Sequence, residues 1–381
     1  MKKNKKTYFP EGFLIGGAAS GMKKSGKDIG VIFCPGGFKA AAVFTKNRFA
    51  AAPVLISRKH LPDGRVLVAN SKFANAATGA RGFRDATETC AFAAGRFGVK
   101  ADEVLVASTG VIGAFLPMAK IKKGIVSVEK TFAEKPVEPE DFADSVMTTD
   151  TYRKISSHGN FWACAKGSGM INPDMATFLC FILTDARVSS YPRMKKIFRE
   201  AAGVFNRMSV DGEMSTNDSV FLLSSMKKTV SETKFKKDLT NVCNDIAAMI
   251  IDDGEGRTKV IEITVASANS ASEAHHLADF LAASPLIKTA FNGESPNWGR
   301  ILSRTGASGV SMNQKKVSVY ICGVLVYRGA PVRFDEKALR ELLRKKEVSF
   351  KVDLSVGRSE CVFSTTDFSE DYIRINAGYL S

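Results

Sequence analysis

The chain has 381 residues, of which 45% are hydrophobic and 24% charged, and its formal net charge is +15. These values are ordinary for a globular protein with a substantial core, and the length allows one large domain or two to three ordinary ones. No run of about 18 apolar residues suggests a membrane span, and the basic N-terminus lacks the apolar segment of a secretory signal. Lysines and arginines lie in short scattered clusters without a nucleic-acid-binding motif, so we expect no nucleic-acid partner.

Cysteine and histidine usage argues against a disulfide framework and against a metal site. The seven cysteines are scattered, and no Cys-x-x-Cys pair occurs. This usage is typical of reduced, buried thiols in a cytoplasmic protein. The four histidines form no metal-binding pattern with cysteines or acidic residues, so we expect no metal.

The predicted elements alternate irregularly between strands and helices. Short apolar runs predict strands at 31–34, 41–45, 54–56, 66–70, 104–109, 178–183, 220–223, 260–266, 317–321, 324–327 and 350–354. Apolar periodicity and capping residues predict helices at 84–97, 191–207, 237–251, 270–286 and 335–346, with a charged surface helix and loop over 129–144. This irregular alternation, without a repeat or a low-complexity linker, favours a mixed α+β fold, and a seam near residue 290 suggests the start of a smaller C-terminal subdomain.

Residues 166–183 join a glycine-rich loop to a predicted buried strand. Gly167 and Gly169 permit unusual backbone shapes, and the Asn-Pro-Asp sequence at 172–174 is typical of a turn. Thr177 lies where this loop meets the strand, eleven positions after Lys166. The position suits a nucleophile, but the β-propensity of threonine explains the residue as well, and these residues alone favour that structural explanation.

Polar stretches at 108–110, 147–151, 254–256 and 376–381 fall near predicted strand ends or the chain end, where functional sites tend to form. Each by itself is more typical of a turn or cap. The sequence lacks a P-loop, a Rossmann fingerprint, a Gly-x-Ser-x-Gly elbow and the pyrophosphate loop of common acetyl-CoA acyltransferases. The scattered histidines also give no Ser-His-Asp triad, so a nucleophile would need an unusual base.

Taken together, these stretches resemble the ornithine acetyltransferase family, also called the glutamate N-acetyltransferases, of arginine biosynthesis. The resemblance runs from about Phe13 to Ser381. It rests on Ala-Val-Phe-Thr at 42–45 with Ala-Pro-Val at 52–54, Ala-Ser-Thr-Gly-Val-Ile-Gly at 107–113, and the motifs at 116–118, 147–151, 166–170, 176–177, 209–213, 215–218, 253–256, 296–300 and 375–377. It implies an α+β fold of layered mixed sheets with flanking helices, like those of DmpA and the ornithine acetyltransferases.

The resemblance also implies self-cleavage between Ala176 and Thr177. The products would be an α chain of residues 1–176 and a β chain of residues 177–381, assembled as two copies of each. Thr177 would then carry a free α-amine, whose pKa of about 8 suits a general base for its own hydroxyl. Such a base fits the scarcity of histidine.

The reaction implied is acetyl transfer from N2-acetyl-L-ornithine to L-glutamate through an acetyl-threonine intermediate. Thr109 and Gly110 match the family's oxyanion hole. The matching substrate-binding positions are Thr151, Lys166, Thr177, Glu255, Asn376 and Ser381, with Thr149 as an alternative to Thr151. By charge, Lys166 suits a substrate carboxylate and Glu255 suits the ornithine ammonium. No cofactor is expected, and acetyl-CoA stays open as a second acetyl donor.

The chain departs from the family pattern in several places. Lys72, Phe73 and Ala77 stand where the family usually has Gly, a small or polar residue, and Cys, and Ser381 replaces a usual threonine. Two other functions stay open from the sequence. One is a self-processed N-terminal-nucleophile amidohydrolase or aminopeptidase of related fold, and the other is an uncleaved binding protein without catalytic activity.

Overall fold

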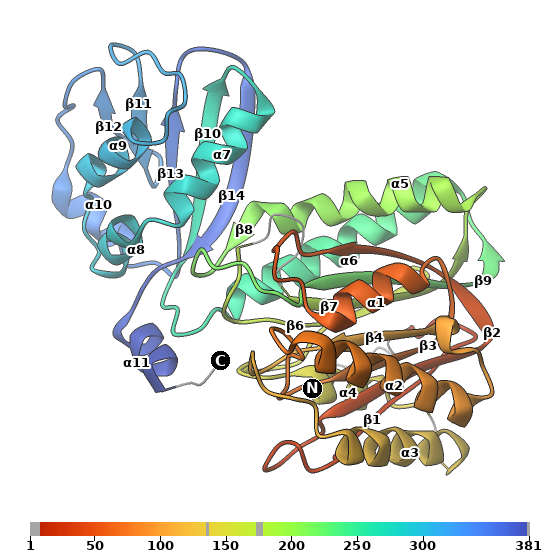
Figure 1. Cartoon of the computed structure of the whole chain (residues 1–381). Coiled ribbons are helices and arrows are strands. Elements are labelled where there is room, and N and C mark those ends of the chain that lie inside the picture. Colours follow the sequence, from red (N-terminus) through yellow and green to blue (C-terminus); the bar gives the residue numbers. More distant parts are fainter. Residues whose placement is uncertain (1–7, 135–136, 173–177, 379–381) are drawn as a thin grey trace, which may run out of the picture.

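The structure, a computed structural model, describes residues 8–134, 137–172 and 178–378 as two units that each contain a β-sheet (Figure 1). The larger unit has an eight-stranded sheet and the smaller a six-stranded one. Both sheets contain parallel and antiparallel pairs. The predicted α+β class with layered mixed sheets and flanking helices is therefore confirmed.

The strand order of the large sheet is β4-β3-β2-β9-β7-β6-β5, and β1 pairs with β2. Its strands are β1 (Leu14–Ala18), β2 (Ile29–Phe44), β3 (Asp63–Asn70), β4 (Val104–Ser108), β5 (Lys154–His158), β6 (Phe161–Lys166), β7 (Leu179–Arg187) and β9 (Ser219–Thr229). The strands predicted at 178–183 and 220–223 correspond to β7 and β9, which pair in parallel near the centre of the sheet. The strand predicted at 178–183 thus lies in the middle of the sheet.

Helices cover the large sheet, which folds back on itself to enclose a core of its own. The helices are α1 (Ala52–His60), α2 (Gly79–Phe97), α3 (Met118–Glu134), α4 (Pro139–Val146), α5 (Tyr191–Ala202) and α6 (Glu232–Asp252), with 3-10 turns at Ala101–Glu103 and Gly203–Arg207. On β7, Ile182 packs in the core formed with α5 and α6, whereas Phe181 packs in a second core together with Leu67 and Leu105 of β3 and β4. Helices α1, α2 and α3 cover the outer side of β3 and β4. The layers are helix, sheet, sheet and helix (Figure 1).

The smaller unit has strand order β12-β11-β13-β10-β14-β8 and one hydrophobic core. Its strands are β8 (Met208–Ser209), β10 (Val260–Ala268), β11 (Ser318–Ile321), β12 (Val324–Arg328), β13 (Glu347–Asp353) and β14 (Ser359–Thr366). Its helices are α7 (Ala271–Ala282), α8 (Pro285–Asn292), α9 (Trp298–Gly306) and α10 (Glu336–Leu343). Apart from β8, the unit begins at β10, earlier than the expected 290, because β10 pairs with β13 and β14 inside its sheet. The segment near 290 instead connects α8 to α9.

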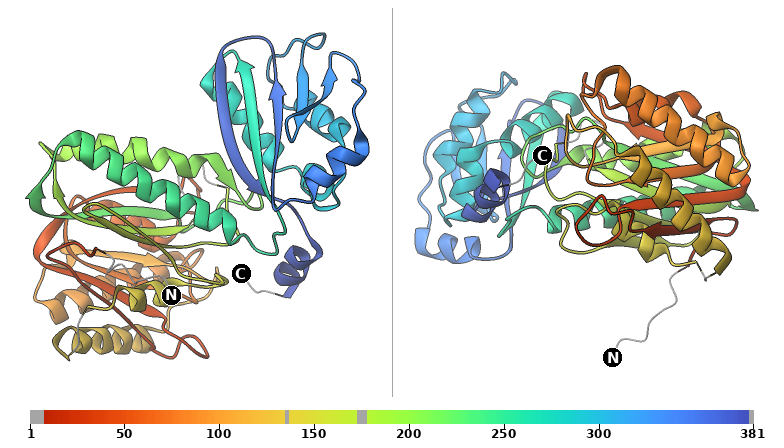
Figure 2. Two further views of the ribbon diagram at one scale, coloured as in Figure 1. Left: turned by 180° about the vertical axis from the view of Figure 1, so that it is seen from behind. Right: turned by 60° about the horizontal axis from the view of Figure 1, so that its bottom comes forward.

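Some elements differ from the sequence-based expectation. The strand predicted at 54–56 is wrong, because these residues lie in α1, which has Pro53 in its first turn, basic residues in its last turn, and contacts with β4. The pattern did not predict β5, β6, β14, α9 or a C-terminal helix, α11 (Glu370–Gly378). Helix α11 has no buried residue and lies beside the junction of the two units (Figure 2). No helix in the described part of the chain has the length and apolarity to cross a membrane.

Candidate active site

A cavity of about 160 Å³ lies between the large unit, the segment that leads to the small unit, and α11. It is lined by Ala74, Thr109, Gly110, Ile112, Thr148, Thr149, Lys166, Gly169, Met170, Phe178, Leu179, Asp211, Glu213, Ser215, Thr216, Asn217, Asp218, Glu255, Tyr372 and Asn376. Five of the residues expected from the sequence therefore meet there: Thr109, Gly110, Lys166, Glu255 and Asn376. The expected residues Ala176, Thr177 and Ser381 lie outside the described residues.

The turn after β4 carries the two candidate oxyanion donors. The Thr109 N–H donates to the Asn70 carbonyl at 3.0 Å, and the Val111 N–H donates to the Lys72 carbonyl at 3.0 Å. Between them, Gly110 has a φ of +129°, and a Cβ added there would lie 2.2 Å from the Lys72 carbonyl carbon. The turn therefore requires glycine. Lys72 itself has a φ of 76°, in the left-handed region that favours glycine, the residue expected there from the family pattern.

The buried side chain of Asn217 holds this turn in place by hydrogen bonds. The Asn217 side-chain amide donates to the Ser108 carbonyl at 2.9 Å and to the Ala74 carbonyl at 2.5 Å. The Ser108 hydroxyl donates to the Asn70 side chain at 2.6 Å. In the sequence, Asn217 belongs to one of the family motifs but has no predicted role. It stands between a polar loop and the apolar run of β9. This position in the sequence indicates a buried polar side chain, which has to make hydrogen bonds inside the protein.

Two opposite charges face the same cavity. Lys166 ends β6, and Glu255 lies in the loop that joins α6 to β10. The Glu255 N–H donates to the Ser168 carbonyl at 2.8 Å, and the Asn376 amide donates to the Glu255 carboxylate at 3.0 Å. A Cβ at position 169 would lie 2.3 Å from that carboxylate, so Gly169 lets the two loops approach closely. The cavity can hold a molecule with both an anionic and a cationic group.

The threonines of the 147–151 segment have different surroundings. Thr149 lines the cavity and its hydroxyl lies 2.7 Å from the Ser168 hydroxyl. The Thr151 hydroxyl donates to Asp253, and its N–H donates to the same carboxylate at 3.0 Å. Thr151 is not among the residues that line the cavity, whereas Thr148 and Thr149 are.

Two carboxyl groups at the cavity, the half-buried one of Asp211 and the buried one of Asp218, had no predicted role. Asp211 accepts hydrogen bonds from the N–H groups of Met170 and Ile171 at 2.6 and 2.9 Å, although burial raises its pKa. Burial also raises the pKa of Asp218 well above its ordinary value. Asp218 directly precedes Ser219, whose N–H donates to the Phe178 carbonyl at 3.0 Å. Among the described residues, no group of three or more His, Cys, Asp or Glu side chains could hold a metal ion.

Two solved structures resemble parts of this chain. The crystal structure of the arginine biosynthesis bifunctional protein ArgJ from Bacillus halodurans matches with a TM-score of 0.48 and 32% identity, covering 52% of this chain and 98% of that chain. The ornithine acetyltransferase from Mycobacterium tuberculosis, solved in complex with ornithine, matches with a TM-score of 0.41 and 35% identity, covering 44% and 94%.

The sequence comparisons cover nearly the whole chain. An arginine biosynthesis bifunctional protein ArgJ from Bacillus cereus is 38% identical over 97% of this chain and 95% of that protein. The protein of the same name from Dehalococcoides mccartyi is 39% identical over 97% and 96%. The ArgJ family model matches residues 14–381. The chain therefore belongs to the ArgJ family of bifunctional arginine-biosynthesis enzymes.

Proposed function

We propose that the chain transfers the acetyl group of N2-acetyl-L-ornithine to L-glutamate through an acetyl-enzyme on Thr177. The observation that carries the proposal is that one cavity is lined by Thr109, Gly110, Lys166 and Glu255. It combines candidate oxyanion donors with charges that complement the carboxylate and the side-chain ammonium of the donor substrate. Phe178, the residue that follows Thr177, also lines this cavity.

The first half-reaction moves the acetyl group to the enzyme. The Thr177 hydroxyl attacks the acetyl carbonyl carbon while its proton passes to the free α-amine of the same residue. The negative charge that develops on the carbonyl oxygen is stabilised by the Thr109 hydroxyl and the Gly110 N–H, and one such donor is typically worth about 3 kcal/mol. The C–N bond then breaks, the α-ammonium of Thr177 gives its proton to the leaving nitrogen, and ornithine is released.

The second half-reaction reverses these steps with another amine. The α-amino group of glutamate attacks the acetyl ester, the Thr177 oxygen leaves and regains a proton, and N-acetylglutamate is released.

The relatives are named as bifunctional proteins. We therefore extend the proposal to acetyl-CoA as a second donor, which an assay with acetyl-CoA and glutamate, without N2-acetylornithine, tests directly.

The proposal includes self-cleavage between Ala176 and Thr177. It is supported by the family membership and by the need for a free α-amine as the base, because none of the described residues that line the cavity is a histidine. The resulting α and β chains would assemble as two copies of each. On a denaturing gel, the mature protein would give two bands, each of about half the full-chain mass of 41.2 kDa.

A Thr177→Ala variant tests the proposed nucleophile. We expect it to remain a single 41.2 kDa chain without acetyltransferase activity, because both the nucleophile and the new N-terminus are lost. Activity is measured as glutamate-dependent release of ornithine from N2-acetylornithine. A cleaved and fully active Thr177→Ala protein would contradict the proposal.

The same assay separates the alternatives. Release of acetate at the same rate with and without glutamate would favour an amidohydrolase over an acetyltransferase. A single full-length band and no turnover of N2-acetylornithine by the unaltered chain would favour an uncleaved binding protein.

A further inference from the structure

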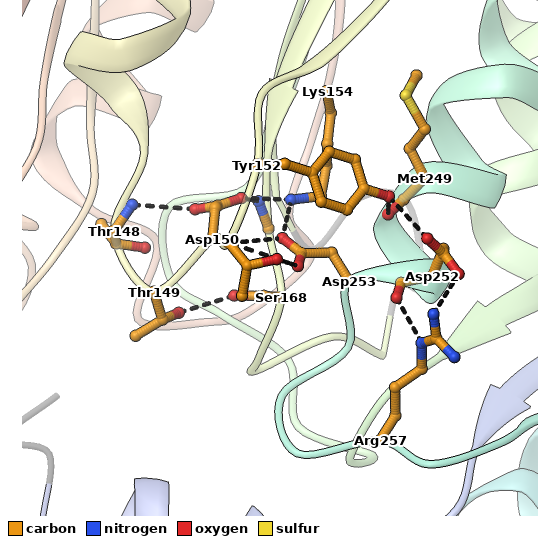
Figure 3. Close-up of polar contacts among 12 residues, drawn as sticks. Thr148, Thr149, Asp150, Tyr152, Lys154, Ser168, Met249, Asp252, Asp253 and Arg257 are labelled. Carbon is orange, nitrogen blue, oxygen red and sulfur yellow. Dashed lines mark hydrogen bonds and ion pairs between the residues drawn. The ribbon is translucent and has the colours of Figure 1, made fainter.

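A buried cluster of three charged side chains lies beside the cavity. The Lys154 ammonium, fully buried, lies 2.7 Å from the Asp150 carboxylate and 2.5 Å from the Asp253 carboxylate (Figure 3). Both carboxylates are also buried, with side-chain exposures of 0% and 3%. We call these three residues the Lys154 cluster. Removing charges from water is costly, and good geometry with further hydrogen bonds is needed to offset that cost.

Asp150 connects the cluster to the Lys166 side of the cavity. Its carboxylate accepts a hydrogen bond from the Gly167 N–H at 2.7 Å and another from the Thr148 N–H at 2.9 Å. Burial raises the pKa of Asp150, but the charges of Lys166 and Lys154 lower it below its ordinary value on balance. Asp150 therefore fixes the backbone that immediately follows Lys166.

Asp253 connects the cluster to the Glu255 side. It lies two residues before Glu255 and accepts hydrogen bonds from the N–H and the hydroxyl of Thr151. A further hydrogen bond holds the loop that carries Glu255, because the Glu255 N–H donates to the Ser168 carbonyl at 2.8 Å. The loop that carries Glu255 is thus held to the same strand end that carries Lys166.

We propose that the Lys154 cluster is a positioning and specificity-determining device that sets the spacing between Lys166 and Glu255. The inference rests on the proposed function, in which Lys166 binds the substrate carboxylate and Glu255 binds the side-chain ammonium. The distance between these two charged groups of the substrate changes with every methylene of its side chain. Lys154 does not line the cavity. It acts through the two carboxylates by holding both loops at one separation, which fits the ornithine side chain.

Substrate homologues test this spacing. N2-acetyl-L-2,4-diaminobutyrate is one methylene shorter than N2-acetyl-L-ornithine, and N2-acetyl-L-lysine is one methylene longer. The measurement is kcat/KM for each donor with glutamate as acceptor. In the unaltered protein we expect ornithine to be preferred over each homologue by about 10-fold or more, the usual value of a single methylene in a fitted site.

Two variants weaken the Lys154 cluster in different ways and should therefore loosen the spacing between Lys166 and Glu255. Asp253→Asn keeps the shape of the side chain but removes the charge that attracts Lys154, and Lys154→Met removes the ammonium that joins the two carboxylates. In both we expect the preference for ornithine over at least one homologue to fall by about 5-fold or more, beyond any general loss of activity. A change in this ratio is a readout that a purely structural role would not give.

Arg153→Gln is the matched control. Arg153 precedes Lys154 and pairs with Asp144 at the surface, where its side chain is 48% exposed, so its removal should leave the preference unchanged. Circular dichroism and thermal melting check that each variant is folded. If Lys154→Met does not fold, Asp253→Asn decides the question.

Two outcomes have different meanings. If the folded variants lose activity by one common factor for all three donors, or lose none, the proposed role of the cluster is overturned. If the unaltered protein transfers no acetyl group from N2-acetylornithine, the proposed function itself fails, and that result is visible before any variant is compared.

Discussion

Gly110 shows how one residue without a side chain sets the geometry of the site. Its φ of +129° is accessible to few other residues, and a Cβ added there would collide with the backbone of Lys72. The N–H that it presents beside Thr109 is aimed by the turn, which Asn217 holds through the Ser108 carbonyl at 2.9 Å. A small displacement of this backbone would move the N–H away from the charge it is proposed to stabilise.

Gly110→Ala is therefore expected to lower kcat by about 100- to 1,000-fold, the usual cost of losing one oxyanion donor. The change in KM should be small, because the donor acts mainly in the transition state. Steady-state kinetics with N2-acetylornithine and glutamate measure both. Gly95→Ala in α2 is the control, because a Cβ there meets no atom within 4 Å. An unchanged kcat in folded Gly110→Ala would remove Gly110 from the mechanism.

Asp28 organises the loop between β1 and β2. Its carboxylate accepts hydrogen bonds from the N–H groups of Ser20, Met22 and Lys23 at 2.6, 2.7 and 3.0 Å. Burial alone would raise the pKa of Asp28, but these donors lower it below its ordinary value of 3.8. A lowered folded-state pKa means that the ionised carboxylate stabilises the fold above pH 3.8, and that this stabilisation is lost as the pH falls through the folded-state value.

Asp28→Asn is expected to lower the free energy of unfolding by about 1–3 kcal/mol at pH 7, because an amide oxygen replaces a charged acceptor of three donors. The difference from the unaltered protein should shrink as the pH falls below about 4. Urea unfolding at a series of pH values measures it. Asp63→Asn is the control, since Asp63 pairs with Lys39 at the surface with 64% of its side chain exposed. A difference that is constant from pH 7 to pH 2 would rule out the charge as its cause.

The large sheet is assembled from both sides of the proposed cleavage position. Strands β7 and β9, which follow it in the chain, lie between β6 and β2, which precede it. The two segments are joined at two separate strand pairs, β2 with β9 and β6 with β7. Cleavage would break one peptide bond and leave both pairs and the shared cores intact.

The two fragments that the proposed cleavage would leave are therefore expected to stay together without a covalent link. They should elute as one species in native gel filtration and separate only in denaturant, because separation requires the central sheet to be opened. Gel filtration with and without urea, followed by denaturing gels, measures this. Separate elution of the two fragments in native buffer would contradict the arrangement of strands.

The cysteines report on the packing of both units. Six of the seven are buried, and Cys322 is partly exposed. Burial raises the pKa of Cys34 to about 11 and that of Cys90 to about 12, which suppresses the reactive thiolate. We expect a thiol reagent to modify at most Cys322 in the native protein and all seven cysteines in denaturant. Rapid modification of several thiols in the folded state would show that a core is open.

The sequence by itself determined the strands with uninterrupted apolar runs and the polar residues at their ends. β7 and β9 are recognisable because each contains an unbroken apolar run, at 179–183 and 220–223, which is typical of a strand buried on both faces. The stretches that hold Thr109, Gly110 and Glu255 were visible as polar residues near predicted strand ends, but the roles expected of these residues came from the family resemblance. The small unit, in contrast, begins well before the expected position, because its limits depend on which strands pair.

Only the tertiary structure decided which side chains act together. The sequence favours Thr151 over Thr149 as a substrate-binding residue, whereas in the structure Thr149 lines the cavity. Thr151 instead bonds to Asp253, about a hundred residues further along the chain. In the sequence Lys154 is one more lysine in a basic chain, yet in the structure it is fully buried between two carboxylates. Local sequence carries no information on such contacts, because their energy depends on burial and on partners that are brought near only when the whole chain has folded.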